Sequence, residues 1–149
     1  MWAVFTYKMS ISKTIFDANF DVLDEIRELV GEIAHQAGFS DRDIYSIQLA
    51  TDEASSNIIE HAYEGIKDGK FELECDTSND ELRIVMRDQG KPFNPSSVPE
   101  PNVHADLADR QIGGLGMYLM RKLMDEVSYQ SFSDAGNVLT MIKRKGESE

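Results

Sequence analysis

Cysteine is nearly absent from this sequence of 149 residues, which contains Cys75 alone. One cysteine cannot form an internal disulfide, and no spacing of cysteine and histidine frames a zinc site. Long apolar runs are lacking too, since the longest, Met1 to Phe5, is far shorter than the roughly 20 residues that span a membrane. The first residues also lack a basic segment followed by an apolar one, so we expect a cytoplasmic protein without a secretion signal or a membrane partner.

Basic residues are scarce, because 15 lysines and arginines face 27 aspartates and glutamates, for a formal net charge of −12. A nucleic-acid-binding protein presents a basic face, and anionic lipid attracts one, so the acidity argues against both partners. The composition, 41% hydrophobic and 28% charged, is typical of a globular protein. The length suits a single core, and we expect residues 1–149 to form one domain.

Proline is rare and confined to one place, since all four prolines lie between Pro92 and Pro101. The surrounding stretch, residues 91–112, has few large apolar side chains and neither a helical nor a strand period. We therefore expect a long loop. A loop of this length inside a compact domain is more often functional than idle.

Regular patterns appear on both sides of that loop. Apolar residues at spacings of three and four predict three helices, and a period of two predicts strands. The helices are expected at residues 22 to about 38, 40–65 and 117–127. The strands are expected at residues 71–77, 81–87, 127–132 and 137–143, with one or two more within residues 1–16. Because helices and strands come in runs, the sequence predicts an α+β fold, a two-layer sandwich of a mixed, largely antiparallel sheet with helices on one face.

Three polar residues follow one face of the second predicted helix: Glu53, Asn57 and His61 are spaced by four and lie beside an apolar stripe. A carboxylate at the edge of a core can accept a proton, and an amide oxygen can bind a hard cation such as Mg²⁺. The alternative is that these are ordinary residues of a helix surface. For His61, we favour a structural role.

Two glycine-containing segments are further candidates. Asp88 ends a predicted strand and could accept a hydrogen bond from a ligand amino group, while Gly90 would allow a sharp turn close to that ligand; the same pattern is a common turn signal. Gly113, Gly114 and Gly116 open the third predicted helix, where free N–H groups and the helix dipole suit a phosphate. Their spacing matches neither a dinucleotide fingerprint nor a Walker A loop, and a hinge is the alternative.

Together these segments provide a metal and base site, a site for recognition of a nucleobase, a lid and a phosphate site, which are the parts that bind a nucleoside triphosphate. Their sequences also resemble motifs of a known superfamily. Glu53–Asn57 resembles the N box of the Bergerat-type ATP-binding domains of histidine kinases, gyrase-type ATPases and related chaperones. Asp88–Phe93 is similar to their first glycine box, and Gly113–Met117 to their second. Within that superfamily, Leu123–Val127 is similar to the segment that follows the second box in the small anti-sigma-factor serine kinases of bacteria. The likeness runs from about residue 13 to 143.

The resemblance implies a role for each matching position. Asn57 would hold the Mg²⁺ that bridges the ATP phosphates, and Glu53 would be the base that accepts a proton from the attacking hydroxyl. Asp88 would accept a hydrogen bond from the adenine amino group, with room provided by Gly90. The loop at residues 91–112 would be a lid over the nucleotide.

The second glycine box would bind the phosphates. Gly114 and Gly116 would present their N–H groups to the phosphates, and Gly113 would also belong to the nucleotide site. Arg110 is the cation expected to reach the γ-phosphate. The last predicted strand departs from the family, because it begins with Gly136 and asparagine where larger relatives have glycine and threonine. We expect Thr140 near the adenine instead.

The resemblance implies an ATP-dependent serine/threonine protein kinase that acts as an anti-sigma factor. It would phosphorylate a small antagonist protein, sequester a sigma factor when that antagonist is unavailable, and form a homodimer. The alternative is a nucleotide-binding regulatory module that switches partners without phosphoryl transfer. An isolated ATP-binding half of a histidine kinase is disfavoured, because 149 residues leave no room for a dimerisation segment that carries the phosphoacceptor.

Overall fold

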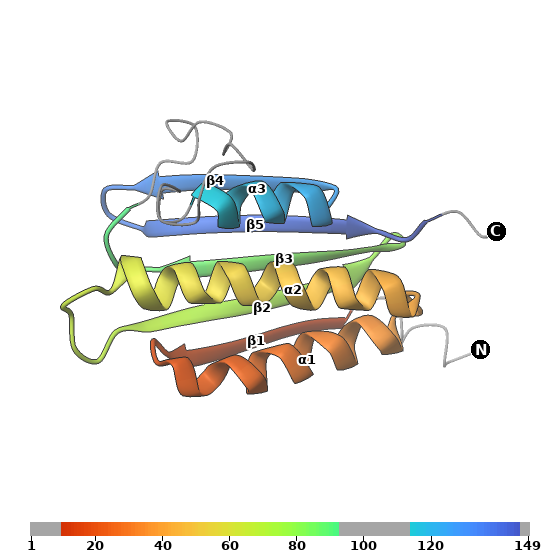
Figure 1. The fold of residues 1–149 in the computed structure, drawn as a ribbon, viewed down its shortest axis with the longest axis horizontal. Helices are drawn as coiled ribbons and strands as arrows, with labels where there is room; N and C mark the ends of the chain where they lie inside the picture. The colour runs from red at the N-terminus through yellow and green to blue at the C-terminus, as the bar shows by residue number, and fades with distance from the viewer. Residues whose placement is uncertain (1–9, 93–113, 147–149) are drawn as a thin grey trace.

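The protein is a two-layer α+β sandwich in the computed structural model, which describes residues 10–92 and 114–146. Five strands form one sheet in the order β1-β2-β3-β5-β4, and all four pairings are antiparallel. Three helices cover one face of this sheet (Figure 1). The predicted fold class is confirmed, and among the described residues the sheet is antiparallel throughout rather than mixed.

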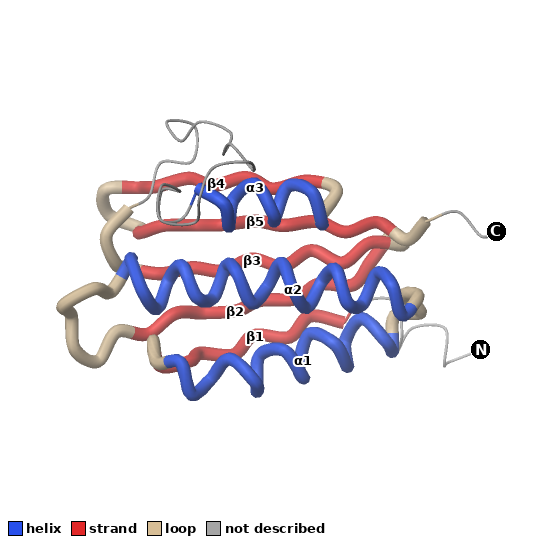
Figure 2. The backbone as a smooth tube through the Cα atoms, viewed as in Figure 1, coloured by secondary structure: helices blue, strands red, loops and turns tan. Residues whose placement is uncertain are grey.

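The elements follow the predicted order. The strands are β1 (Ser10–Asp17), β2 (Lys70–Ser78), β3 (Glu81–Asp88), β4 (Glu126–Phe132) and β5 (Gly136–Arg144). The helices are α1 (Leu23–Gln36), α2 (Asp41–Asn57) and α3 (Gly114–Leu123), with a 3₁₀ turn η2 (Phe20–Val22) before α1 and a π-helical turn η3 (Ile58–Ala62) after α2. Figure 2 shows how the helices and strands separate into two layers.

Two helix ends differ from the prediction. The helix that we expect to reach Gly65 is α-helical only to Asn57, and then widens into the π-helical turn η3, which closes with a hydrogen bond from Tyr63 N to Ile58 O (3.2 Å). The third helix ends at Leu123, so Val127 belongs to β4 and not to the helix stripe. Both apolar patterns continue past the true helix end, because the following residues also pack against the core.

Local signals explain where the other elements start and stop. The Ser40 side chain caps α2 by accepting a hydrogen bond from Asp43 N (3.2 Å). Asn79 and Asp80 join β2 to β3 with φ values of 53° and 59°, as a tight two-residue hairpin requires. Of the expected N-terminal strands, β1 is present; residues 1–9 and most of the expected lid, residues 93–112, lie outside the described residues.

The core lies between the helices and the sheet. Its fully buried side chains come from the three helices and from β2, β3 and β5: Ile26, Val30, Ile47, Met120, Leu73, Ile84, Met86, Phe71 and Met141, with Phe16 of β1 buried beside them. None of the helices in the described part of the chain has the length and apolarity to span a membrane.

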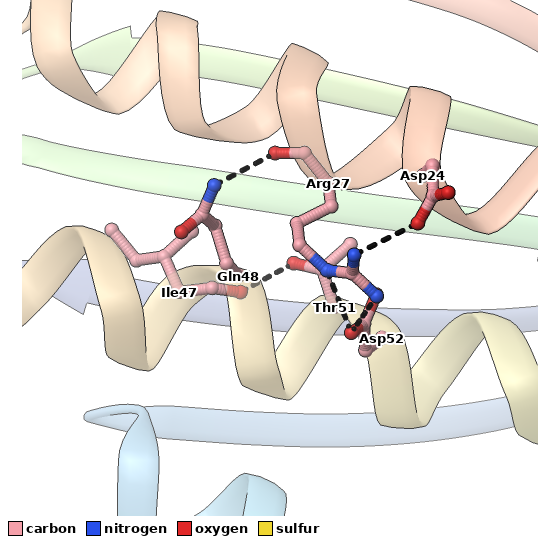
Figure 3. Close-up of polar contacts among 6 residues, drawn as sticks. All are labelled: Asp24, Arg27, Ile47, Gln48, Thr51 and Asp52. Carbon is pink, nitrogen blue, oxygen red and sulfur yellow. Dashed lines mark hydrogen bonds and ion pairs between the residues drawn. The ribbon is translucent and has the colours of Figure 1, made fainter.

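A polar cluster fixes α1 to α2 across their exposed edge (Figure 3). The Arg27 guanidinium donates two hydrogen bonds to Oδ2 of Asp52 (3.0 and 2.7 Å) and a third to Oδ1 of Asp24 (2.9 Å). Gln48 Nε2 donates to the Arg27 carbonyl (3.1 Å). Because Asp52 precedes Glu53, this cluster also fixes the helix segment that carries the predicted base.

Candidate functional site

A pocket of about 350 Å³ lies where the C-terminal end of α2 meets the start of α3. We call it the central pocket. Its lining includes Asn57, His61 and Asp88, three residues that the sequence analysis singles out. Apolar side chains complete the lining, among them Ala54, Ile58, Met117, Met120 and Leu139. The fold therefore brings the first and second candidate segments together around one cavity.

The third candidate segment meets the first directly. A methyl group added to Gly116, in the first turn of α3, would lie 3.2 Å from Oε2 of Glu53 and 3.3 Å from Nδ2 of Asn57. The side chains of Glu53 and Asn57 therefore lie beside Gly116 in the glycine-rich helix start. Among the described residues, no group of three or more histidine, cysteine, aspartate or glutamate side chains could hold a metal ion. The oxygen ligands available here are the amide of Asn57 and the carboxylate of Glu53, beside the N-terminus of α3. They suit a hard cation whose remaining ligands come from a phosphate.

Glu53 has the electrostatic environment of a proton acceptor. Burial beside the core raises the pKa of its carboxyl above the ordinary value, and the nearby carboxylates of Asp52 and Glu60 raise it further. A raised pKa strengthens a carboxylate as a base. Asp52 is itself paired with Arg27 through the two hydrogen bonds described above.

Asp88 is held rigidly at the floor of the central pocket. It is 5% exposed, and its Oδ1 accepts hydrogen bonds from Gly90 N (2.9 Å) and from Asn137 Nδ2 (2.8 Å). Burial raises the pKa of the Asp88 carboxyl, although both hydrogen bonds act to lower it. With two protein donors on Oδ1, the other oxygen, Oδ2, is left to accept a hydrogen bond from a ligand.

Asn137 supports Asp88, and the sequence alone does not predict this role. It is 2% exposed, and besides Asp88 it donates to the Gly90 carbonyl (3.0 Å) and accepts from Ser131 Oγ (2.8 Å). It therefore joins the β4–β5 hairpin to the end of β3. The available signal is the asparagine that follows Gly136, where the family pattern has a threonine.

Gly90 is explained by a close approach within the protein. A Cβ at this position would overlap the backbone of Ala62 at the end of η3, whose carbonyl accepts a hydrogen bond from Lys91 N (2.7 Å). Gly90 is not among the described residues that line the central pocket. The sequence predicts that Gly90 lies close to a ligand, but its close neighbour in the structure is the π-helical turn η3. A role of Gly90 beside the adenine remains a prediction.

Thr140 does not lie where the sequence analysis expects it. Side chains alternate between the two faces of a strand, and in β5 the helix side holds Leu139, which lines the central pocket, and Met141, which is fully buried in the core. Thr140 therefore points to the opposite face of the sheet, where it pairs with Val85 and Ser128. We correct the prediction that Thr140 is near the adenine.

The remaining predicted residues are located only in part. Gly114 is the first residue of α3, as the prediction of a glycine-rich helix start requires. Gly113 and Arg110 lie outside the described residues. His61 lines the central pocket from η3.

Comparisons with known proteins find similar domains. A family model described as "Histidine kinase-like ATPase domain" matches residues 16–143. A protein named serine-protein kinase RsbW from Bacillus licheniformis is 37% identical over 127 residues, which cover 79% of this chain and 75% of that protein. The protein of the same name from Bacillus subtilis is 30% identical over 119 residues, covering 77% and 74%.

The fold is also similar to a solved structure. A crystal structure of the RsbU and RsbW domains of a Mycobacterium tuberculosis protein superposes with a TM-score of 0.64 at 20% sequence identity. The match covers 91% of this chain and 32% of that longer one. At this identity, the similarity supports the fold alone.

Proposed function

The chain belongs to the family of histidine kinase-like ATPase domains, and on that basis we propose that it is a serine-protein kinase that transfers the γ-phosphoryl group of ATP to a small antagonist protein. The proposal extends to this chain the activity in the name of its relatives, serine-protein kinase. It also includes sequestration of a sigma factor, as a homodimer, when the antagonist is unavailable.

One observation carries the proposal: the side chains of Glu53 and Asn57 both lie beside Gly116, in the first turn of α3. Phosphoryl transfer needs mainly the positioning of its reactants and neutralisation of phosphate charge. The N-terminus of α3 would provide N–H groups from Gly114 and Gly116, and a partial positive charge, for the phosphates. Glu53 would accept the proton of the attacking serine hydroxyl.

The adenine would bind at the other side of the central pocket. Oδ2 of Asp88 would accept a hydrogen bond from the adenine amino group, while Asn137 and Gly90 hold the carboxylate in position through Oδ1. The apolar lining, which includes Ile58, Met120 and Leu139, suits the faces of a flat base.

Mg²⁺ fits the amide donor at the end of α2. Asn57 would hold the ion through its side-chain oxygen, and the ion would supply neutralisation of the phosphate charge when bound. Gly113 and Arg110 complete the proposed phosphate site, with Arg110 as the cation that would reach the γ-phosphate.

The test separates transfer from binding. Purified protein is incubated with Mg-ATP labelled at the γ-phosphate and with candidate antagonist domains from the same genome, and labelled antagonist is measured. We expect Glu53→Gln to reduce transfer by about 100- to 10,000-fold, the usual contribution of a general base, while ATP affinity stays largely unchanged. Glu28→Gln is the matched control, since Glu28 is exposed on α1 and loses the same charge.

Two results would contradict the proposal. If the wild-type protein binds ATP but labels no antagonist, the chain is a nucleotide-binding regulatory module. If Glu53→Gln keeps full transfer, another group is the base.

A further inference from the structure

A second pocket, of about 820 Å³, lies at the opposite end of α2 from the central pocket. It is formed where the start of α2, the end of α3 and the end of β5 meet, at the end of the molecule near the marked C-terminus (Figure 1). We call it the cationic pocket. Its charged lining consists of Arg42, Lys122, Lys143, Lys145 and one acidic residue, Asp43. The described lining thus carries a net charge of +3 on a chain whose net charge is −12.

Two of the lysines are held in place by the protein, each with only a long ion pair to a carboxylate. Lys143 Nζ donates to the carbonyl of Leu123 at the end of α3 (2.8 Å) and lies 3.9 Å from Oδ1 of Asp43. Lys145 Nζ lies 5.8 Å from the centre of the Phe39 ring and 3.9 Å from Oδ1 of Asp80. At 3.9 Å, an ammonium and a carboxylate make no direct hydrogen bond. Both ammonium groups are therefore positioned and only partly neutralised.

Arg42 is unfavourably placed for its own helix. It lies in the first turn of α2, where the helix dipole contributes a partial positive charge. Its side chain has no ion pair with any carboxylate in the described parts of the chain, and the residue is exposed. A cation at this position lowers the stability of the helix, so the local structure does not explain why an arginine is present. An anion bound in the pocket would explain it, because the arginine would then have a partner of opposite charge.

We propose that the cationic pocket binds a carboxylate-rich segment of a protein partner. Charge complementarity favours an anionic ligand, and the Phe39 ring and the hydroxyls of Ser40 and Ser46 in the lining suit a polypeptide that carries both apolar and polar groups. A nucleic acid is disfavoured, because an extended polyanion would run beyond the pocket along a chain whose net charge is −12. The inference deepens the proposed function, since a protein kinase needs a protein partner. It adds a docking site remote from the reacting groups.

The test measures binding of a short fluorescein-labelled peptide of alternating glutamate and serine by fluorescence anisotropy, with no ATP present. We expect saturable binding that weakens as salt is added. A peptide with glutamine in place of glutamate is the ligand control, and we expect no saturable binding of it. Inorganic phosphate is the competitor for a site that takes any small anion.

The variant Arg42→Glu makes the test specific. We expect it to weaken peptide binding by about tenfold, because it replaces an attraction with a repulsion. The melting temperature should stay the same or rise, because an acidic side chain in the first turn of a helix is stabilising. Lys67→Glu is the matched control: Lys67 is exposed in the loop between η3 and β2, and its substitution changes the net charge equally.

The inference is overturned if the glutamate and glutamine peptides bind equally, or if Arg42→Glu and Lys67→Glu weaken binding to the same degree. Displacement of the peptide by an equal concentration of phosphate would also overturn it, in favour of a small-anion site. Because the assay uses neither ATP nor an antagonist, its failure is distinguishable from failure of the kinase proposal.

Discussion

The two ends of α2 differ in how they would bind negative charge. The C-terminal end faces the central pocket, whose described charged lining is Glu64, Asp88 and Lys91. The N-terminal end faces the cationic pocket, with four cations and one carboxylate. Yet the ligand proposed for the central pocket, ATP, is itself a polyanion.

With these proposed ligands, the charge of a pocket's side chains does not by itself indicate the charge of the ligand. At the central pocket, we expect a metal ion and backbone N–H groups at the start of α3 to neutralise the phosphates. At the cationic pocket, side chains alone would neutralise the carboxylates of the proposed peptide ligand. Substitutions at either end therefore test whether the two ends act independently.

After Glu53→Gln, the largest effect is expected from Asp88→Asn. We expect ATP affinity to fall by about 10- to 100-fold, because a charged acceptor for the adenine amino group is lost. Isothermal titration calorimetry measures this loss. The peptide affinity of the cationic pocket should not change, and if it falls in parallel, the two ends are coupled.

The same variant has a defined effect on stability. Since burial raises the pKa of Asp88 in the folded protein, the folded state favours the protonated form, and stability declines as pH rises through the interval between the unfolded and folded pKa values. Asparagine removes that cost and still accepts from Gly90 and Asn137. The melting temperature at neutral pH should stay equal or rise, so a large decrease would show that the carboxylate is needed structurally.

A smaller effect is expected from Gly116→Ala. The added methyl group would press on Glu53 and Asn57 at 3.2 and 3.3 Å, and we expect phosphoryl transfer to fall by about tenfold as these side chains move. Alanine is the better helix former, by about 1 kcal/mol, so thermal unfolding should show no loss of stability. Arg121→Ala, on an exposed position of α3, is the control. Unchanged transfer in Gly116→Ala would mean that Glu53 and Asn57 act in another arrangement.

The smallest effect is expected from Arg27→Gln. Without the guanidinium, Asp52 is no longer neutralised, so the pKa of Glu53 rises further above its ordinary value. A base with a higher pKa loses its ionised form at a higher pH as the solution is acidified, so the acidic limb of the pH–rate profile should move to higher pH, by less than about one unit. Asp24→Asn is the control, because it leaves the bonds between Arg27 and Asp52 intact. An unmoved profile would exclude electrostatic coupling from α1 to the base.

The sequence predicts the layers well because its local signals are strong. The hairpin at Asn79 and Asp80, the cap at Ser40 and the helix start at Gly114 each depend on neighbouring residues, and the structure has all three. The π-helical turn after Asn57 escapes prediction because its apolar residues continue the α-helical spacing closely.

Contacts between distant segments account for the other differences. Asn137 and Asp88 lie far apart in the chain, and only the pairing of β3 with β5 brings them together. That same pairing directs Thr140 to the far face of the sheet. The sequence does not predict the cationic pocket either, because three of its cations, Arg42, Lys122 and Lys143, belong to three different elements.

The strand order has a consequence for how the protein is made. β5 is the last described strand in sequence, yet it occupies an interior place in the sheet, between β3 and β4. During synthesis on the ribosome, β1, β2 and β3 emerge early, and the edge of β3 stays unpaired until β5 follows. Asp88 acquires its hydrogen bond from Asn137 only at that late stage. A nascent chain therefore completes the proposed adenine site only when nearly all of the described chain has left the ribosome.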